Sequence, residues 1–322
     1  MGVTENDHVI APNITFVATL NAITYTGAQP ILIDVNQDTW QMDLELLEQY
    51  LQQNTKAKTI NNQTYRFDTT TGKRVKAIMP VHVLGNMGDM IRLQHIAKTY
   101  NLNLIEDSTE ALGSRFNNKH AGTFGDIGVF SFNGNKIIST GGGGVLVTNN
   151  ETLAKKAKHL TTQAKMSAVD YDHDEIGFNY RLVNLLAAIG VAQMEQFPGI
   201  LKAKKAMDAF YRKELNGVGD ISFQTVHQLT SANGWLFTFS TAHSDALLKY
   251  LNNNGVQARS FWRPMNQLVM FKEALFISTN NVSEKVYKNN VSIPSSAGIT
   301  QAQLETVVKT IKAFYARLSS IY

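Results

Sequence analysis

Short apolar segments alternate with amphipathic ones along the first half of this chain, and no other feature constrains its fold as strongly. Buried strands are predicted at residues 29–35, 75–83 and 102–106, and helices at 43–53 and 89–100. Strands that alternate with helices at this spacing are typical of βαβ units, which build a mainly parallel sheet covered by helices. The sequence therefore predicts an α/β fold.

The same pattern continues to about residue 164. Two apolar runs at 127–132 and 144–148 predict further strands, and 151–164 predicts an amphipathic helix. A helix is also expected at 15–25. Residues 54–74 are polar and carry turn signals, so they predict a surface hairpin.

The pattern changes near residue 195, where mixed strands and helices replace the regular alternation. A long basic helix is predicted at 199–215 and a final helix at 301–319. A chain of 322 residues is long enough for two cores. We therefore predict a large domain over residues 1–195 and a smaller α+β domain over residues 196–322.

The composition excludes some kinds of chemistry. The chain has no cysteine, so it has no disulfide, thiolate metal site or catalytic thiol. Its net charge of +4 is small, and the basic clusters are not interleaved with aromatic residues as in single-strand nucleic-acid binders. No signal peptide is visible, and no stretch approaches the ~18 apolar residues of a membrane span. We expect a cytoplasmic protein that binds neither nucleic acid nor membrane.

The first residue that suggests chemistry is Asp107, which follows the predicted strand at 102–106. Ligands of open α/β sheets bind beyond the carboxyl ends of the strands, where a carboxylate could hold a cation or a protonated ring nitrogen. The alternative is capping of a following helix, because Asp-Ser-Thr is good capping chemistry. Taken alone, this residue favours capping.

The segment SFNGNK at 131–136 follows another predicted strand. The Ser131 hydroxyl and the amides of the turn could hold a phosphate, and Lys136 could reach the same pocket. Lysine forms Schiff bases with carbonyl compounds once its site deprotonates it. The alternative is an ordinary surface lysine after a turn.

Four consecutive glycines follow at 141–144. Glycines tolerate a positive φ and a close backbone approach, so the run could bind a nucleotide phosphate. It lacks the Lys-Ser/Thr of a P-loop, and it is not the Gly-x-Gly-x-x-Gly that opens a helix in dinucleotide-binding folds. A tight reversal between two strands is the favoured interpretation.

Each of these signals is weak alone, but their order is informative. Together they supply an anion for a pyridinium nitrogen, donors for a phosphate and a lysine for a carbonyl group. Pyridoxal 5'-phosphate (PLP) requires these three groups, because its protonated ring must act as an electron sink. The sequence therefore predicts a PLP site.

Nearly the whole chain, from about Val9 onward, resembles the DegT-type sugar aminotransferases, a branch of the fold-type I PLP enzymes. The resemblance is carried by APNITFVATLNAI, PVHVLGNMGDM, IEDSTEALGS, GTFGDIGVFSFNGNKIISTGGGG, EIGFNYRLVNLLAAIG and RSFWRPMNQL. The GNMGDM, EDSTEALGS and FNGNK variants are similar to the subgroup that acts on UDP-linked 4-keto-6-deoxy-N-acetylhexosamines in bacillosamine- or legionaminic-acid-type pathways. The resemblance implies transamination of such a sugar, with glutamate as amino donor, in bacterial surface-glycan biosynthesis.

The resemblance also implies roles for individual residues. Lys136 would bind PLP as a Schiff base and shuttle a proton, Asp107 would pair with the pyridinium nitrogen, and Ser131 would bind the phosphate. Phe16 would stack on the ring, although an isolated phenylalanine on a helix more often belongs to a core. Asn179 would reach the phosphate of the neighbouring subunit's cofactor, which implies a homodimer with shared active sites.

Glu110 falls in the implied cofactor pocket, where many relatives have Gln or His near the phenolic oxygen. A carboxylate there would repel a phenolate unless it is protonated or turned away. His82, Arg181 and Arg259 are candidate substrate contacts, with packing and surface roles as the equal alternative. Some relatives replace the lysine by histidine and act as dehydratases, so Lys136 favours transamination.

Two other functions remain open. Relatives carry additional N-terminal residues with a Ser-Gly-Thr turn at a helix N-terminus that holds the cofactor phosphate, and this chain starts at Met1 without that turn. One alternative is therefore an N-terminally shortened relative that binds PLP weakly or is catalytically inactive. The other is a nicotinamide-dependent enzyme, against which the missing glycine fingerprint argues.

Overall fold

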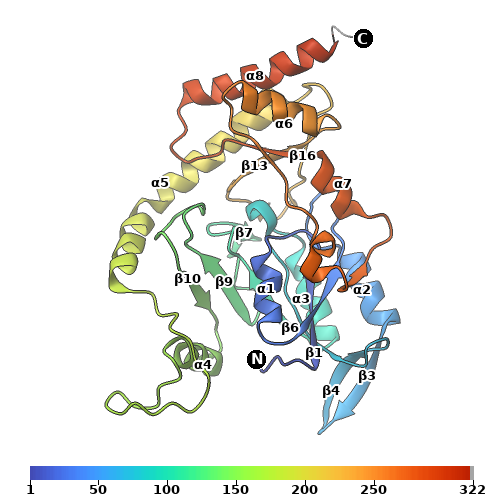
Figure 1. Cartoon of the computed structure of the whole chain (residues 1–322), viewed down its shortest axis with the longest axis vertical. Coiled ribbons are helices and arrows are strands. Elements are labelled where there is room, and N and C mark those ends of the chain that lie inside the picture. The colour runs from blue at the N-terminus through green and yellow to red at the C-terminus, as the bar shows by residue number, and fades with distance from the viewer. Residues whose placement is uncertain (320–322) are drawn as a thin grey trace.

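A nine-stranded sheet forms the centre of the molecule, of which the computed structural model describes residues 1–319 (Figure 1). Its main path runs in the order β10 (Gly144–Val147), β9 (Ile127–Ser131), β6 (Asn103–Asp107), β5 (Arg74–Ile78), β1 (Asp7–Pro12), β2 (Gln29–Ile33) and β15 (Leu275–Ile277). Every neighbouring pair on this path is parallel except β10 with β9. The mainly parallel sheet predicted from the alternating pattern is confirmed.

Helices cover both faces of this sheet, because successive strand residues point to opposite sides. Ile10 of β1 lies in one apolar core with α2 (Leu44–Gln53) and α3 (Met90–Thr99). Its neighbour Val9 lies in a separate core with α1 (Ala18–Thr24) on the other face. The large part of the molecule is thus a three-layer α/β/α arrangement.

Side-chain caps begin the predicted helices. Asp43 caps α2, Asp89 caps α3 and Asn150 caps α4 (Glu151–Thr161), each by accepting hydrogen bonds from backbone N–H groups of the first turn. These caps satisfy donors that have no partner within the helix. The helices predicted at 43–53, 89–100 and 151–164 are confirmed.

The predicted surface hairpin consists of β3 (Thr55–Ile60) and β4 (Gln63–Asp68), which pair antiparallel. β4 also pairs antiparallel with β5, so the hairpin extends the main sheet. The strand predicted at 75–83 ends earlier, at Ile78. Pro80 follows, and it has no N–H to continue a sheet, so the chain enters a 3-10 turn at Val83–Gly85.

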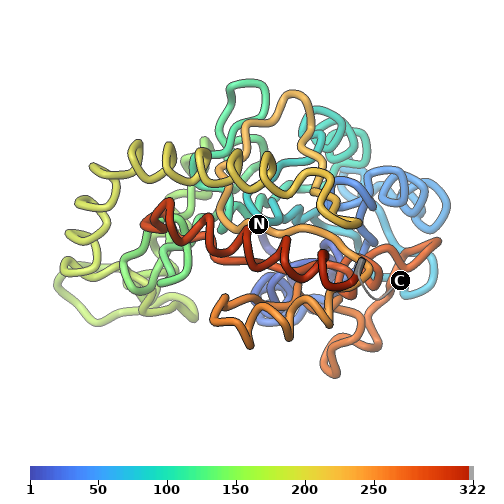
Figure 2. Tube along the Cα trace, turned by 90° about the horizontal axis from the view of Figure 1, so that it is seen from above, coloured from blue at the N-terminus to red at the C-terminus, as the bar shows by residue number. Residues whose placement is uncertain are grey.

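The C-terminal part forms a second, smaller sheet, seen at the top of Figure 1. Its strand order is β11 (Ser222–Phe223), β13 (Phe237–Ser240), β16 (Asn290–Ile293) and β14 (Arg259–Ser260). This sheet shares one apolar core with α5 (Asn184–Leu215), α6 (Ser244–Asn253) and α8 (Gln301–Ser319). Figure 2 shows α5 and α8 running side by side over this core.

The helix predicted at 199–215 is only the second half of α5, which begins at Asn184. Pro198 lies inside α5, whereas in the sequence it resembles a helix start because proline favours the first turn. α5 crosses the predicted boundary between residues 195 and 196. β15 also returns from the C-terminal part to the main sheet, so the division into two domains stays a prediction.

The remaining elements are short. They are the three-stranded sheet β12 (Thr230–Ser231), β7 (Arg115–Phe116) and β8 (Lys119–His120), helix α7 (Val282–Asn289), and 3-10 turns at Met265–Gln267 and Val269–Phe271. Within residues 1–319, no helix combines the length and apolarity needed to cross a membrane.

Candidate active site

Asp107 is the last residue of β6, at the carboxyl end of the parallel sheet. The Thr19 hydroxyl of α1 donates to one carboxylate oxygen at 2.7 Å, and the Thr109 backbone N–H donates to the other at 3.2 Å. No helix begins within residues 108–114, which form turns, so the capping alternative is wrong. The position at the carboxyl end of a strand, predicted from the sequence, is confirmed.

Lys136 lies in the loop that follows β9, and its side chain is only 11% exposed. Its Nζ atom is 3.8 Å from Oε1 of Glu110 and 4.4 Å from the centroid of the Trp235 ring. The alternative of an ordinary surface lysine is therefore wrong. Lys136 and Glu110 meet although they come from the loops after two different strands.

Glu110 is 3% exposed. Burial raises its pKa to about 8; the positive charge of Lys136 and a hydrogen bond from the Leu84 amide oppose this shift, and the charge of Asp107 adds to it. The Leu84 N–H donates to Oε2 at 2.8 Å. This shift in pKa favours the protonated form of the Glu110 carboxyl at neutral pH.

The turn that presents this N–H to Glu110 has unusual backbone geometry. Leu84 has φ of +62°, in the left-handed region that non-glycine residues rarely adopt. A Cβ atom on the next residue, Gly85, would clash with the Asn233 side chain. Asn233 is fully buried and donates to the carbonyl oxygens of Glu110 and Leu112, at 2.7 and 2.9 Å. The C-terminal part thus braces the loop that carries Glu110.

Two further predicted cofactor residues lie near strand and helix ends. Phe16 precedes α1 and is 55% exposed, so it is not a core residue. Ser131 is the last residue of β9, and its hydroxyl accepts a hydrogen bond from the Asn133 N–H at 3.2 Å. The glycine run links β9 to its antiparallel neighbour β10, so the predicted strand reversal is confirmed.

The predicted substrate contacts are not gathered at this site. His82 is 1% exposed, and its Nε2 lies 2.9 Å from Oε2 of Glu106, so in this structure it packs against that carboxylate and its substrate contact stays a prediction. Burial alone would raise the pKa of Glu106, but hydrogen bonds from His82 and from two glycine amides hold it below its usual value. Arg259 is exposed on β14 of the small sheet.

Asn179 and Arg181 are exposed on the loop between α4 and α5, where Asn179 pairs with Thr162. Neither residue is enclosed by its own chain. The implied role of Asn179, which requires a neighbouring subunit, stays a prediction.

Sequence reasoning missed Trp235, the aromatic neighbour of Lys136. Trp235 is 3% exposed, and its indole N–H donates to the Asn135 carbonyl oxygen at 2.8 Å. Asn135 and Trp235 are 100 residues apart, and a tryptophan before a predicted strand looks like a core residue. No local signal in the sequence could have assigned it to this cluster.

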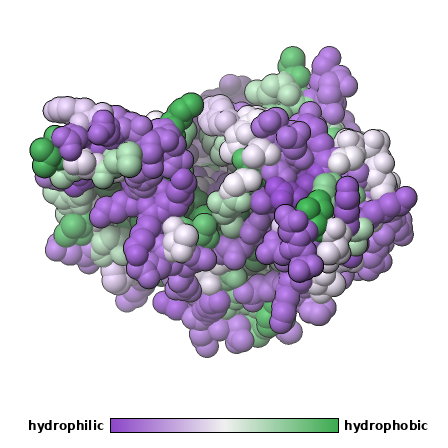
Figure 3. Space-filling view, turned by 90° about the horizontal axis from the view of Figure 1, so that it is seen from below, coloured by the Kyte–Doolittle hydropathy of each residue, from purple (hydrophilic) through white to green (hydrophobic). Residues whose placement is uncertain are grey.

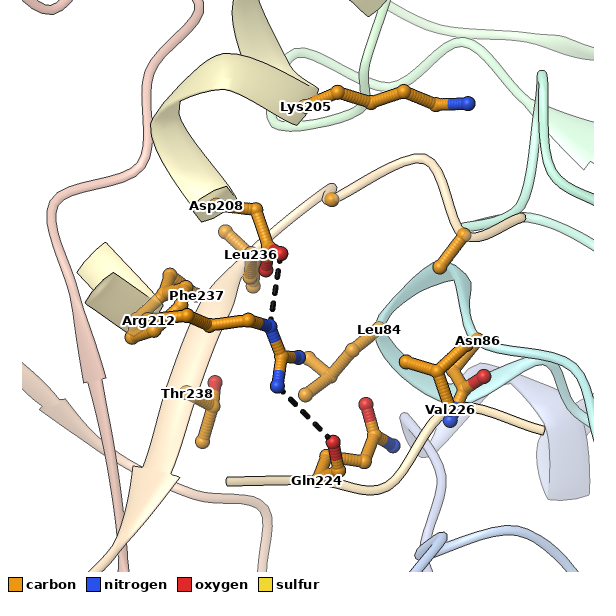
Figure 4. Close-up of a pocket in the computed structure, with 12 residues that line it drawn as sticks. Leu84, Asn86, Lys205, Asp208, Arg212, Gln224, Val226, Leu236, Phe237 and Thr238 are labelled. Carbon is orange, nitrogen blue, oxygen red and sulfur yellow. Dashed lines mark hydrogen bonds and ion pairs between the residues drawn. The ribbon is translucent and has the colours of Figure 1, made fainter. Parts of the chain in front are cut away.

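A small cavity with both polar and apolar walls lies behind the Leu84 turn (Figure 4). Its volume is about 80 Å³, and Arg212 crosses it. The Arg212 guanidinium donates to Asp208 at 2.9 Å and to the Gln224 carbonyl at 3.3 Å. The Leu84 side chain lines this cavity, and its backbone N–H donates a hydrogen bond to Glu110. The cavity therefore adjoins the site, but Lys136 is not among its lining residues.

The amino-acid sequence matches known proteins along almost its entire length. The family model described as the DegT/DnrJ/EryC1/StrS aminotransferase family matches residues 1–312. EpsN of Bacillus subtilis (strain 168), provisionally named a pyridoxal phosphate-dependent aminotransferase, is 35% identical over 96% of this chain and 78% of its own length. GDP-perosamine synthase of Escherichia coli O157:H7 is 34% identical over 98% of this chain and 81% of its own length. The relatives also include transaminases of UDP-linked sugars.

Solved structures share the fold. A DegT DnrJ EryC1 StrS aminotransferase from Brucella abortus superposes with a TM-score of 0.87 at 24% identity, over 98% of this chain and 81% of that chain. This likeness confirms the predicted fold-type I architecture.

Proposed function

This chain belongs to the DegT/DnrJ/EryC1/StrS aminotransferase family, and we propose that it transfers the amino group of glutamate to a nucleotide-linked 4-keto-6-deoxy sugar. It is a PLP-dependent aminotransferase, as the sequence predicted. The sugar, the donor and the roles of individual residues belong to the proposal. The observation that carries it is the convergence of Glu110, Lys136 and Asp107 beyond the carboxyl end of the sheet.

The side chains at this end of the sheet fit the functional groups of PLP. Asp107 offers a carboxylate for the ring nitrogen, Lys136 an amine for the aldehyde, and Phe16 an exposed aromatic face for the ring. Ser131 and the turn after it would hold the phosphate. When bound, PLP supplies an electron sink through its protonated ring.

Lys136, Asp107 and Glu110 would then take part in the reaction. Lys136 would hold the cofactor and, once released, move a proton at its Nζ atom to and from the carbon that gains or loses the amine. Thr19 and the Thr109 amide fix the Asp107 carboxylate in one orientation. Burial raises the pKa of Glu110, and in its protonated form this residue would donate a hydrogen bond to a phenolic oxygen that an ionised carboxylate would repel.

A UDP-linked N-acetylated sugar is the finer form of this proposal. The motif variants GNMGDM, EDSTEALGS and FNGNK support it. The similarity to GDP-perosamine synthase supports a GDP-linked sugar instead. Arg181 and Arg259 are exposed cations and stay candidate contacts for the diphosphate of either substrate.

We also propose that two copies of the chain form a dimer through the α4–α5 surface, which comprises the loop after α4 and the first half of α5. Large apolar side chains there are 42–88% exposed: Met166, Val169, Tyr171, Ile176, Phe178, Tyr180, Val183, Leu185, Ile189, Val191 and Met194. Isolated hydrophobic residues are visible on the lobe around α4 at the left of Figure 3. Eleven large apolar side chains exposed on two adjoining segments favour a protein interface. A second copy is the favoured occupant because Asn179, the residue expected to serve a neighbouring site, lies within it.

The cofactor site is tested by trapping. Purified protein is mixed with PLP, its visible absorption is recorded, and borohydride then fixes any bound cofactor for peptide mapping by mass. We expect one modified peptide that contains Lys136, and no such peptide from Lys136→Ala. Label scattered over exposed lysines, with no visible band, would contradict the proposed site and favour a weakly binding or inactive relative.

The substrate is tested by offering UDP- and GDP-linked 4-keto-6-deoxy sugars with glutamate. We expect amination of the UDP-linked sugar. Amination of only the GDP-linked sugar would overturn the proposal of a UDP-linked substrate. It would leave the proposal of a nucleotide-linked 4-keto-6-deoxy sugar intact. A cytoplasmic location belongs to the same proposal, and fractionation of cells that express the full chain would check it.

A further inference from the structure

Trp235 connects the C-terminal part of the chain to the reactive lysine. It lies just before β13, and its ring faces Lys136, with Nζ 4.4 Å from the ring centroid. The indole N–H donates to the carbonyl oxygen of Asn135, the residue before that lysine, at 2.8 Å. One side chain therefore contacts both the backbone and the amine of the segment that carries the reaction.

The backbone of Trp235 is held on both sides. Its N–H donates to Oδ1 of the fully buried Asn233 at 2.9 Å. Its carbonyl oxygen accepts a hydrogen bond from Nζ of Lys204, a residue of α5 that is 4% exposed. The same ammonium group also donates to the carbonyl oxygen of Ser295. The Lys204 amine therefore holds the backbone of Trp235 in place and does not point into solvent.

We propose that Trp235 is the positioning residue for Lys136. The face of an aromatic ring attracts a lysine ammonium group within about 6 Å of its centroid. A lysine side chain has several rotatable bonds, and holding its amine against a fixed ring removes most of the wrong orientations before reaction. This inference rests on the proposed role of Lys136.

Glu110 is the other side chain beside the Lys136 amine, and its contact with that amine is weak. Oε1 of Glu110 is 3.8 Å from Nζ, a distance too long for a direct hydrogen bond, and burial raises the pKa of this carboxyl, which weakens its attraction for the amine. The ring of Trp235 is the second group placed against this amine, and it is held in position by its own hydrogen bonds. Because Trp235 belongs to the C-terminal part, the placement of that part decides where the lysine amine lies.

The test uses the full chain, free of cofactor, with Trp235→Leu, Trp235→Phe and Trp40→Phe. The phenylalanine at 235 keeps a ring face, and Trp40 is a buried tryptophan that packs on Phe261 instead of Lys136. The first readout is the rate at which PLP develops its visible band, with attachment to Lys136 verified by borohydride and mass. The second is the visible circular dichroism of the bound cofactor, which reports its fixed orientation.

We expect Trp235→Leu to slow attachment roughly 10-fold and to reduce the visible circular dichroism. Trp235→Phe should slow attachment about 2- to 3-fold, and Trp40→Phe should match the wild type. Wild-type rates and spectra for both Trp235 variants would overturn the proposal. If Trp235→Leu does not fold, the comparison of Trp235→Phe with Trp40→Phe decides in the same way.

A third readout separates this inference from the proposed function. Reductive methylation of the cofactor-free protein, followed by mass, gives the reaction rate of the Lys136 amine itself. Formaldehyde is small and needs access to the amine rather than the fixed orientation that PLP needs. We therefore expect Trp235→Leu to raise this rate several-fold, because the amine loses its cover, and an unchanged rate would overturn the proposal. Absence of PLP attachment in the wild type, with an altered methylation rate in the variant, would refute the proposed role of Lys136 in catalysis but still show that Trp235 holds its amine in place.

Discussion

Two regions of the molecule differ in the kind of side chain that they bury: the carboxyl end of the sheet around Asp107 encloses polar groups, and the α4–α5 surface leaves apolar groups exposed. At the sheet end the chain encloses polar groups, since Glu110 is 3% and the Lys136 side chain 11% exposed. On the α4–α5 surface it exposes apolar ones, since Tyr171 and Ile176 are 87% and 88% exposed. Both arrangements cost free energy unless something compensates. The buried polar cluster is compensated by contacts within the chain, whereas for the exposed surface we propose compensation by a second molecule.

Helix α5 takes part in both regions. Its first buried residue is Lys204, which braces Trp235, and its later buried residues join the C-terminal core. The half before Lys204 has no buried residue, and neither has α4. A single helix thus connects the proposed dimer surface to the side chain that faces Lys136.

The largest expected effect comes from Lys136→Ala, which tests the sheet end alone. Transamination should fall by at least about 10³-fold, because the covalent attachment and the acid–base group are lost together. The measurement is the glutamate-dependent change in the visible absorption of PLP-treated protein. Lys98→Ala, at an exposed lysine of α3, is the matched control. The molecular mass in solution should not change, and residual activity above one tenth of wild type would refute the assignment.

The next effect tests the α4–α5 surface alone. Ile176→Asp combined with Phe178→Asp should weaken self-association by about 10²-fold or more, because unpaired charges would be buried at the interface. Sedimentation at several concentrations measures the dimer dissociation constant. Ile91→Asp, at a residue 56% exposed on α3, is the control. If the wild type is a monomer, or if the double variant dimerises normally, the proposed interface is wrong.

A smaller effect is expected from Asp107→Asn, which keeps the shape of the side chain and removes its charge. Turnover should fall by roughly 10²-fold, because the neutral amide no longer favours a protonated ring nitrogen. Asp89→Asn, at the cap of α3, is the control for a similar change elsewhere. Steady-state kinetics with glutamate make the comparison, and equal rates for the two variants would remove Asp107 from the site.

The last prediction concerns stability rather than turnover or self-association, and it is a pH dependence. The pKa of Glu110 is raised from 4.5 to about 8 in the fold. Its protonated form therefore stabilises the folded state fully below about pH 4.5, and this contribution is lost as the pH rises to about 8, at up to about 1.4 kcal/mol per pH unit.

Glu110→Gln should flatten this slope in the cofactor-free protein, because glutamine does not titrate. Denaturant unfolding at several pH values measures the free energy of unfolding. Glu273→Gln, at a carboxylate 88% exposed, should leave the slope unchanged. A Glu110→Gln slope equal to that of the wild type would mean that Glu110 is ionised in the fold.

Local features of the site were predictable from the sequence, and contacts between distant segments were not. Asp107 at a strand end and the glycine reversal follow from residues near in sequence, whose periodicity decides whether they form strands or turns. The buried role of His82 depends on Glu106 of the neighbouring strand. The start of α5 was missed because Pro198 resembles a helix start, although the helix continues through it.

The sequence by itself determined the α/β architecture, the family, the cofactor and the lysine expected to bind it, because strand periodicity and motif order are written along the chain. Only the tertiary structure decided that Glu110 is buried beside Lys136 and that Trp235 faces the same amine. It also decided which apolar residues stay exposed on the α4–α5 surface. The physical reason is that burial, and with it protonation and orientation, depends on which segments far apart in the chain come into contact, and no local pattern specifies those contacts.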